Sequence, residues 1–162
     1  NKVSDAIKGK TFTFGSKGST SGRLMPEFFI REDLGKSPND LFKKVGFSGN
    51  HSKTIELVQS GAYEVGAVNF KVWDRELKAG NIDPKKVNVI YKTPTYADYN
   101  FTARGDLDKT YGAGFTQKLT NAILNLKDRA ILDAFPRSSF IEAKNSDFDS
   151  ILDTAKKIGI ID

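Results

Sequence analysis

The sequence predicts an α/β fold whose main sheet is doubly wound and mainly parallel. Short β-rich runs alternate with helical patterns through the first half of the 162-residue chain, and a loop rich in glycine, serine or asparagine follows each run. This alternation is typical of strand–loop–helix units, in which parallel strands carry helices on both faces. We expect the three strands at residues 10–14, 44–47 and 64–68.

A helix is expected after each of these strands. The first runs from Arg23 to an end near Leu34-Gly35, with Pro26 early enough to bend it. The second follows the loop Ser48-Gly49-Asn50-His51 and continues through Val58, and Ser60-Gly61 closes it. The third extends from about Lys71 to Lys78. Helices of this length fit between parallel strands of one sheet.

The second half of the chain has a less regular pattern. Its expected elements are a buried strand at 87–91, a hinge-like crossing at 93–99, a strand at 100–104, and helices at 107–125 and 148–158. Gly112 and Gly114 weaken the start of the first of these helices. Ser146 or Asp147 is expected to cap the last helix, and Gly159 is expected to stop it.

Composition excludes several classes of function. Basic residues number 25 and acidic residues 20, and the lysines are spread along the chain without a basic run, which argues against nucleic-acid binding. The absence of cysteine excludes disulfides, thiolate metal sites and cysteine catalysis. No apolar run approaches the ~20 residues of a membrane span. Because the chain opens at Asn1 without an initiator Met, we expect it to be mature, trimmed or internal to a longer protein.

The clearest sign of a ligand site is the loop from Phe14 to Gly22. Its glycines allow close approach of a ligand, and Ser19, Thr20 and Ser21 offer three consecutive hydroxyl donors before a helix begins. The amide groups and the positive dipole end of that helix complete a site for a small anion. An ordinary strand–helix connection explains the same sequence, so both interpretations stay open.

Two further loops are expected at the same edge of the sheet. In doubly wound sheets ligands lie outside the carboxyl ends of the strands. His51, the only histidine, and Asn69 follow the second and third strands. His51 could donate to an anion, which would in turn favour the imidazolium. A structural or exposed histidine is the alternative, and Asn50 or Ser52 could simply cap the helix.

The crossing segment contributes Asp98, which lies between Tyr96 and Tyr99. One interpretation is an exposed turn residue. The other is a carboxylate that accepts a hydrogen bond from a protonated ligand oxygen, which would select P–OH ligands over sulfate. Tyr96 and Tyr99 could line an apolar face of the ligand, although strand packing explains Tyr99 equally well.

Catalysis is not the favoured function. Serine, histidine and aspartate are all present, but no Gly-x-Ser-x-Gly elbow surrounds a serine. The dispersed acidic residues lack the spacing of metal ligands, so we expect no catalytic residues, no metal and no cofactor.

Several motifs together resemble the substrate-binding proteins of phosphate, phosphite and phosphonate ABC transporters, which have the type 2 periplasmic-binding fold. The matching stretches cover nearly the whole chain in collinear order: Gly-Lys-Thr-Phe-Thr-Phe-Gly-Ser at 9–16, Ser-Thr-Ser-Gly-Arg-Leu-Met-Pro at 19–26, Phe-Ser-Gly-Asn-His at 47–51, Gly-Ala-Val-Asn at 66–69 with Trp73, Pro-Thr-Tyr-Ala-Asp-Tyr at 94–99, and the tail from 147 to 159.

The resemblance implies a site for a small phosphorus oxyanion. Proteins of this family hold the oxyanion with the hydroxyl loop, the histidine and the aspartate, which correspond here to Ser19, Thr20, Ser21, His51 and Asp98, with Asn69 and Tyr96 beside them. Aminoalkylphosphonate binders tend to carry a carboxylate near the third loop. Asn69-Phe70-Lys71 occupies that place here, which favours phosphite, methylphosphonate or phosphate.

The resemblance also implies a cellular role. The chain is expected to act in an ABC importer, in the periplasm or on the outer face of the membrane, where a lipid anchor is one option. It would pass its ligand to the transporter permease. Two alternatives stay open: a ligand-sensing domain of a receptor or regulator with the same fold, and an enzyme that uses the hydroxyls of residues 19–21 with His51.

The same resemblance predicts the domain organisation. Residues 1–99 correspond to the second ligand-binding lobe, and residues 100–162 to the hinge crossing and the C-terminal helices of the first lobe. The chain is therefore expected to be a C-terminal portion that lacks the first lobe. Such a portion would bind its ligand weakly or self-associate to cover apolar surface.

Overall fold

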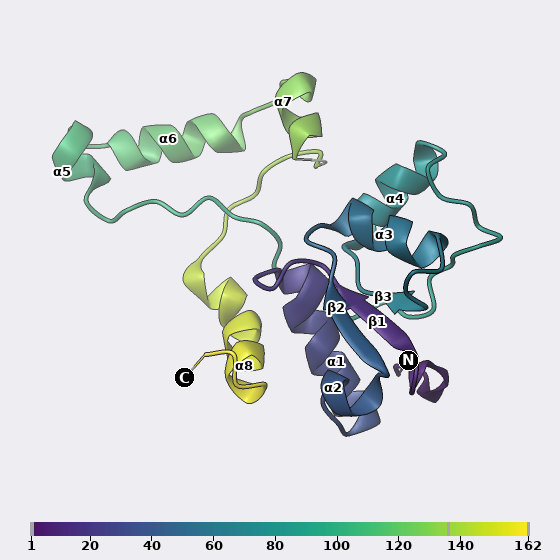
Figure 1. The fold of residues 1–162 in the computed structure, drawn as a ribbon. Coiled ribbons are helices and arrows are strands. Elements are labelled where there is room, and N and C mark those ends of the chain that lie inside the picture. The colour runs from purple at the N-terminus through teal and green to yellow at the C-terminus, as the bar shows by residue number, and fades with distance from the viewer. Residues whose placement is uncertain (1, 136, 162) are drawn as a thin grey trace. The chain divides into compact units, whose positions relative to one another are not determined.

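The computed structural model describes residues 2–135 and 137–161 of the chain (Figure 1). It divides into two compact units. Unit 1 runs to Tyr96 and resumes at Ser150, whereas unit 2 comprises Ala97–Asp149. Unit 1 contains the sheet, and the described residues of unit 2 are helical or irregular.

The sheet of unit 1 has three parallel strands in the order β2-β1-β3. They are β1 (Thr11–Phe14), β2 (Lys44–Phe47) and β3 (Val65–Gly66). The three predicted strands are confirmed, although β3 is shorter than expected. At Gly66 an added Cβ would lie 2.7 Å from the Thr54 methyl group, so the third strand passes directly under a helix.

Helices cover both faces of this sheet, as Figure 1 shows for unit 1. Phe12 and Phe14 belong to the main core cluster on one face, together with residues of the first two α-helices such as Ile30 and Leu41. Thr13, between them on the strand, points to the opposite face and is fully buried. The helical elements of this part of the chain are η1 (Asp5–Ile7) before β1, η2 (Thr20–Leu24), α1 (Met25–Leu34) and α2 (Pro38–Leu41) between β1 and β2, α3 (His51–Gln59) between β2 and β3, and α4 (Phe70–Lys78) after β3.

The first predicted helix differs at its start. Instead of an α-helix from Arg23, a π-helical turn, η2, leads into α1, and the Ser19 side chain caps it. Pro26 is in the first turn of α1, a position that proline accepts without breaking the helix. Gly35 ends α1 in the left-handed conformation with φ of 71°, as predicted.

The strand predicted at residues 87–91 is wrong. These residues are irregular and pair with no strand in the described part of unit 1. Val89 and Ile90 are 54% and 57% exposed, whereas Tyr91 packs against the core cluster. An apolar β-rich run forms a strand only where a neighbouring strand satisfies its backbone groups, and the described residues provide no such neighbour for this run.

Unit 2 corrects two further predictions. The strand expected at 100–104 is irregular and exposed. The single helix expected at 107–125 is two helices, α5 (Leu107–Tyr111) and α6 (Phe115–Leu124). Gly112 and Gly114 separate them with φ values of 100° and 79°, which no helix can contain. The sequence did not predict the next helix, α7 (Arg129–Ala134).

The last helix is α8 (Asp149–Lys157), which follows the short turn η3 (Asn145–Phe148). The expected cap is wrong, because Ser146 and Asp147 both lie inside η3, where Asp147 accepts a hydrogen bond from the Lys144 amide at the start of that turn. Gly159, with φ of 70°, stops the helix as predicted. From Ser150 onward α8 belongs to unit 1, where Ala155 is buried and Lys157 lies over the Phe28 ring.

Candidate anion-binding site

The carboxyl ends of the three strands bring three loops together. Just beyond β2, the Ser48 amide donates to the Phe14 carbonyl at 2.9 Å, and the Gly49 amide donates to the Gly15 carbonyl at 3.3 Å. Just beyond β3, the Ala67 amide donates to the Thr13 carbonyl at 3.0 Å. The sheet ladder therefore continues into the loops and sets their starting positions.

The first loop closes on itself between two glycines. The Gly15 amide donates to the Gly22 carbonyl at 2.8 Å. A Cβ on Gly22 would lie 2.9 Å from Ser19 Oγ, 3.0 Å from His51 Cε1 and 3.2 Å from Gly15 Cα, so only glycine fits there without a shift of its neighbours. The Ser19 hydroxyl accepts the Gly22 amide at 2.9 Å and keeps its own proton for donation.

His51 is the first residue of α3, where Asn50 caps the helix by accepting the Lys53 amide at 2.8 Å. His51 Nδ1 accepts a hydrogen bond from the Asn69 amide at 3.2 Å. The ring proton is thereby placed on Nε2, so the imidazole is a neutral donor. Burial lowers the pKa of His51 below its ordinary value, which favours the same neutral form.

Asn69 links the three loops. Its side-chain Nδ2 donates to Ser21 Oγ at 3.2 Å, and its Oδ1 caps α4 by accepting the Lys71 amide at 2.9 Å. Both Asn69 and Ser21 are buried. Asn69 therefore holds Ser21 through its side-chain amide and His51 through its backbone N–H. The hydroxyl proton of Ser21 is left for donation.

The structure therefore gathers four predicted site residues in unit 1: Ser19, Ser21, His51 and Asn69. Thr20 lies half-buried between the two serines at the start of η2. Hydroxyl protons, an Nε2–H and the first-turn amides of two helical segments can together hold a small anion with neutral donors. The sequence missed that Asn69 acts through its neighbours, since that depends on a contact between residues 48 positions apart.

The remaining two predicted residues lie at the division between the units. Tyr96, half-buried, is the last residue of this part of unit 1, whereas Asp98 is exposed and belongs to unit 2. Within unit 2, Arg137 Nε donates to Asp98 Oδ2, and the Arg137 guanidinium lies 5.8 Å from the Tyr99 ring centroid. No local pattern in the sequence points to Arg137, which is 39 positions away from its partner.

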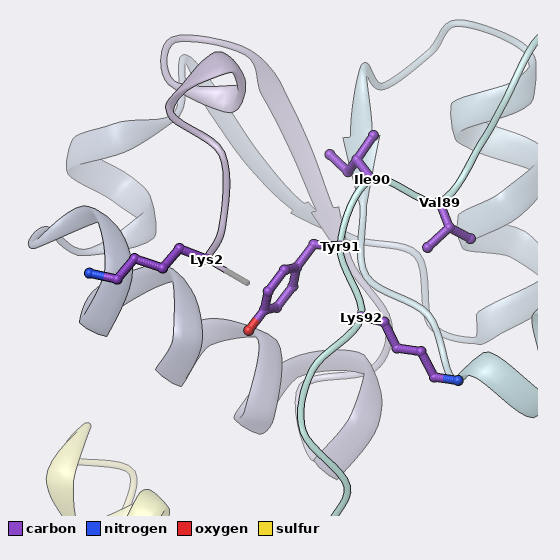
Figure 2. Close-up of a pocket in the computed structure, with 5 residues that line it drawn as sticks. All are labelled: Lys2, Val89, Ile90, Tyr91 and Lys92. Carbon is purple, nitrogen blue, oxygen red and sulfur yellow. The ribbon is translucent and has the colours of Figure 1, made fainter.

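Unit 1 also has a hollow of about 360 Å³, and none of the predicted site residues is among its lining residues (Figure 2). It is lined by Lys2, Val89, Ile90, Tyr91 and Lys92. Burial and the Asp33 carboxylate raise the pKa of the Tyr91 phenol at its wall. Three of its lining residues, Val89, Ile90 and Tyr91, belong to the irregular segment 87–91 that was predicted as a strand.

Residues 2–135 and 137–161 also bear on metal binding and on membrane insertion. No group of three or more histidine or acidic side chains there could hold a metal ion. Nor does any helix in that part of the chain have the length and apolar character needed to cross a bilayer.

Residues 1–148 match the family described as the periplasmic phosphonate substrate-binding protein of an ABC transporter. The chain belongs to this family. Proteins of the phosphonate-binding family are substrate-binding components of transporters and not enzymes, which confirms the prediction against catalysis.

Relatives of known description support the same assignment. A probable ABC transporter phosphite binding protein, PhnD1 of Prochlorococcus marinus (strain MIT 9301), is 41% identical over 160 residues, which are 96% of this chain and 54% of the relative. The structure of PhnD1 from this organism in complex with methylphosphonate matches with a TM-score of 0.87 and 40% identity, over 99% of this chain and 63% of that chain. The predicted type 2 periplasmic-binding fold is confirmed. The chain spans about half the length of the curated relative.

Proposed function

We propose that this chain forms one wall of a cleft that captures a small phosphorus oxyanion, such as a phosphonate, phosphite or phosphate, and delivers it to a transporter permease. The observation that carries the proposal is the hydrogen-bonded set of Ser21, Asn69 and His51 behind the hydroxyl loop. Relatives described as phosphite-binding and as bound to methylphosphonate support the ligand class. The site of action is outside the cytoplasm, where the family works.

Neutral donors suffice for such a ligand. Each hydrogen bond to a charged group contributes roughly 1.5–3 kcal/mol. Four or five such bonds, from Ser19, Thr20, Ser21, His51 and helix amides, reach about micromolar affinity or better when closure of a cleft excludes water. In this proposal residues 1–99 form the second lobe, and residues 100–162 include the crossing back toward the first.

Asp98 has a separate role in the proposal: its carboxylate accepts a hydrogen bond from a P–OH group. A fully ionised oxyanion would face it with two acceptors and no proton between them, so sulfate is rejected. Arg137 Nε pairs with Asp98 Oδ2, and the carboxylate has further lone pairs with which to accept. Tyr96 lies two residues away and would border the apolar side of the ligand.

The hydroxyl loop is tested by calorimetric titration of the chain with phosphite, methylphosphonate, aminoethylphosphonate, phosphate and sulfate. Gly22→Ala forces Ser19 and His51 apart and is expected to weaken binding of the phosphorus ligands at least tenfold. Gly18→Ala is the matched control, because an added Cβ meets nothing within 4 Å there. Equal binding by the two variants would contradict the role of the loop.

The role of Asp98 is tested with the same panel, on either side of the last ionisation of each ligand. Affinity should fall once a ligand loses its final proton, and Asp98→Asn should relax the rejection of sulfate, because an amide can donate. If the unmodified chain binds sulfate and phosphite equally, Asp98 does not select ligands by accepting a hydrogen bond from a P–OH group.

A further inference from the structure

One guanidinium fastens the hydroxyl loop to the rest of unit 1. In the exposed part of the loop, the Lys17 carbonyl oxygen accepts a hydrogen bond from Arg23 Nη1 at 3.0 Å. Arg23 Nε donates to Glu27 Oε2 on α1 at 3.3 Å. Its Cζ also lies 5.5 Å from the centroid of the Phe47 ring at the end of β2. A single side chain thus joins the loop, α1 and β2.

The carboxylate that receives Arg23 is buried. Glu27 is only 6% exposed, and Arg31 donates to its other oxygen at 2.7 and 3.1 Å. A buried carboxylate is strongly unfavourable unless it is paired and hydrogen-bonded, so Glu27 keeps both guanidinium groups in place. Arg23 therefore has a fixed anchor on α1, unlike the partners of an exposed surface pair.

Phe47 adds a second hold on the same loop. Its ring stacks on the buried Phe14 ring at 5.8 Å, which fixes it on the sheet. Lys17 Nζ lies 5.6 Å from the centroid of the Phe47 ring, so the ring attracts both Lys17 and Arg23. Lys17 is thereby held at its carbonyl and at its ammonium group.

We infer that Arg23 is a positioning residue that fixes residues 16–19 of the hydroxyl loop in place before any ligand arrives. A loop ordered in advance spares the ligand the entropy cost of ordering it, so affinity is higher. Arg23 acts through Lys17 and Glu27. The effect on ligand affinity rests on the proposed function, whereas the order of the loop is a property of the chain alone.

Hydrogen exchange of the loop amides measures this order without a ligand. In the full chain, Arg23→Gln is expected to speed exchange of amides 16–22 roughly tenfold, since it removes a charge-assisted hydrogen bond. Arg31→Gln is the matched control: among the described residues Arg31 hydrogen-bonds to Glu27 and to no residue of the loop. It should lower thermal stability while loop exchange stays unchanged. Arg23→Lys should restore part of the protection.

Unchanged loop exchange in Arg23→Gln, or equal acceleration in Arg31→Gln, would overturn the inference. If Arg23→Gln does not fold, Arg23→Lys takes its place, because one ammonium group keeps the charge but lacks the separate Nη1 and Nε donors that bond the Lys17 carbonyl and Glu27. Loop exchange in Arg23→Lys that is faster than in the unmodified chain supports the inference, and unchanged exchange overturns it.

A parallel titration with methylphosphonate separates the two proposals. Arg23→Gln is expected to bind roughly tenfold more weakly than Arg31→Gln. A chain that binds no phosphorus oxyanion contradicts the proposed function, and in that case the exchange rates alone decide the role of Arg23.

Discussion

Protonation of His51 controls how the third loop is held to the second. In the folded chain the Nδ1 atom accepts the Asn69 amide, and burial lowers the pKa of His51 below 6.5. The unfolded chain therefore binds more protons in this range, and the free energy of unfolding rises with pH. Stability should be fully present above about pH 6.5 and fall as the pH drops through the folded-state pKa.

The measurement is direct because the chain has one histidine. The Cε1 proton resonance gives the pKa of His51, and urea denaturation at several pH values gives the stability. His51→Gln should flatten the slope between the two pKa values. A histidine that titrates at or above 6.5 would show that burial does not dominate its environment.

At the scale of single residues, the sequence predicts which residue types lie at the site and at which positions, but not their hydrogen-bond partners. Ser19, Ser21, His51 and Asn69 could be named because strand–loop–helix order places them at one edge. The tautomer of His51 and the double use of the Asn69 amide follow from contacts between distant loops, which no local pattern contains. Arg23, Glu27 and Arg31 did leave a signal, since their spacing of four residues is typical of helical ion pairs.

Two helices, α3 and α4, are joined by Glu76. Ser52 on α3 donates to Glu76 Oε1 at 2.9 Å, Asn81 donates to Oε2 at 2.7 Å, and Arg75 pairs with the same carboxylate. These hydrogen bonds, with that of Asn81 foremost, lower the pKa of Glu76 to about 2. Because Ser52 follows His51, this contact also steadies the helix end that carries the histidine.

Glu76→Gln is expected to destabilise the chain by about 1 kcal/mol at neutral pH, because a neutral amide accepts these bonds less strongly. The stabilisation is present above the ordinary pKa of 4.5 and is lost as the pH falls toward about 2. Urea denaturation at neutral and acidic pH measures both effects. Glu56→Gln, at an exposed residue of α3, is the control and should change stability by less than about 0.5 kcal/mol. Equal effects of the two variants on stability would contradict the role of Glu76 in joining α3 and α4.

Elements were predictable where the signals were local. Alternating strands and loops located β1 and β2, and Gly35 and Gly159 marked helix ends through their left-handed backbone. The runs at 87–91 and 100–104 have strand-like composition, yet a strand also needs a paired neighbour. The apolar spacing in 107–125 suggested one helix, but the positive φ angles of Gly112 and Gly114 interrupt it.

At the scale of the whole chain, apolar surface is exposed in both units. Phe101, Tyr111 and Ile141 of unit 2 are 60%, 63% and 83% exposed. In unit 1, Val89 and Ile90 are each more than half exposed. Exposed apolar groups of this size promote association. We expect sedimentation velocity to show that the isolated chain self-associates in a concentration-dependent manner. We also expect the isolated chain to bind its ligand weakly.

Ile141→Glu should reduce this association without loss of helical signal. Thr120→Glu adds the same charge at an exposed polar position of α6 and should leave association unchanged. A monodisperse monomer that binds a phosphorus oxyanion with submicromolar affinity would contradict the expectation.

The contact between Gly15 and Gly22 has an evolutionary consequence. Because the hydrogen bond between these two residues closes residues 15–22 into a ring, the two ends of the loop stay together whichever side chains stand between them. Under the proposed function, substitutions within the ring would alter which anion is preferred while the sheet keeps its register. Ligand preference and fold stability can therefore diverge independently among proteins that share this frame.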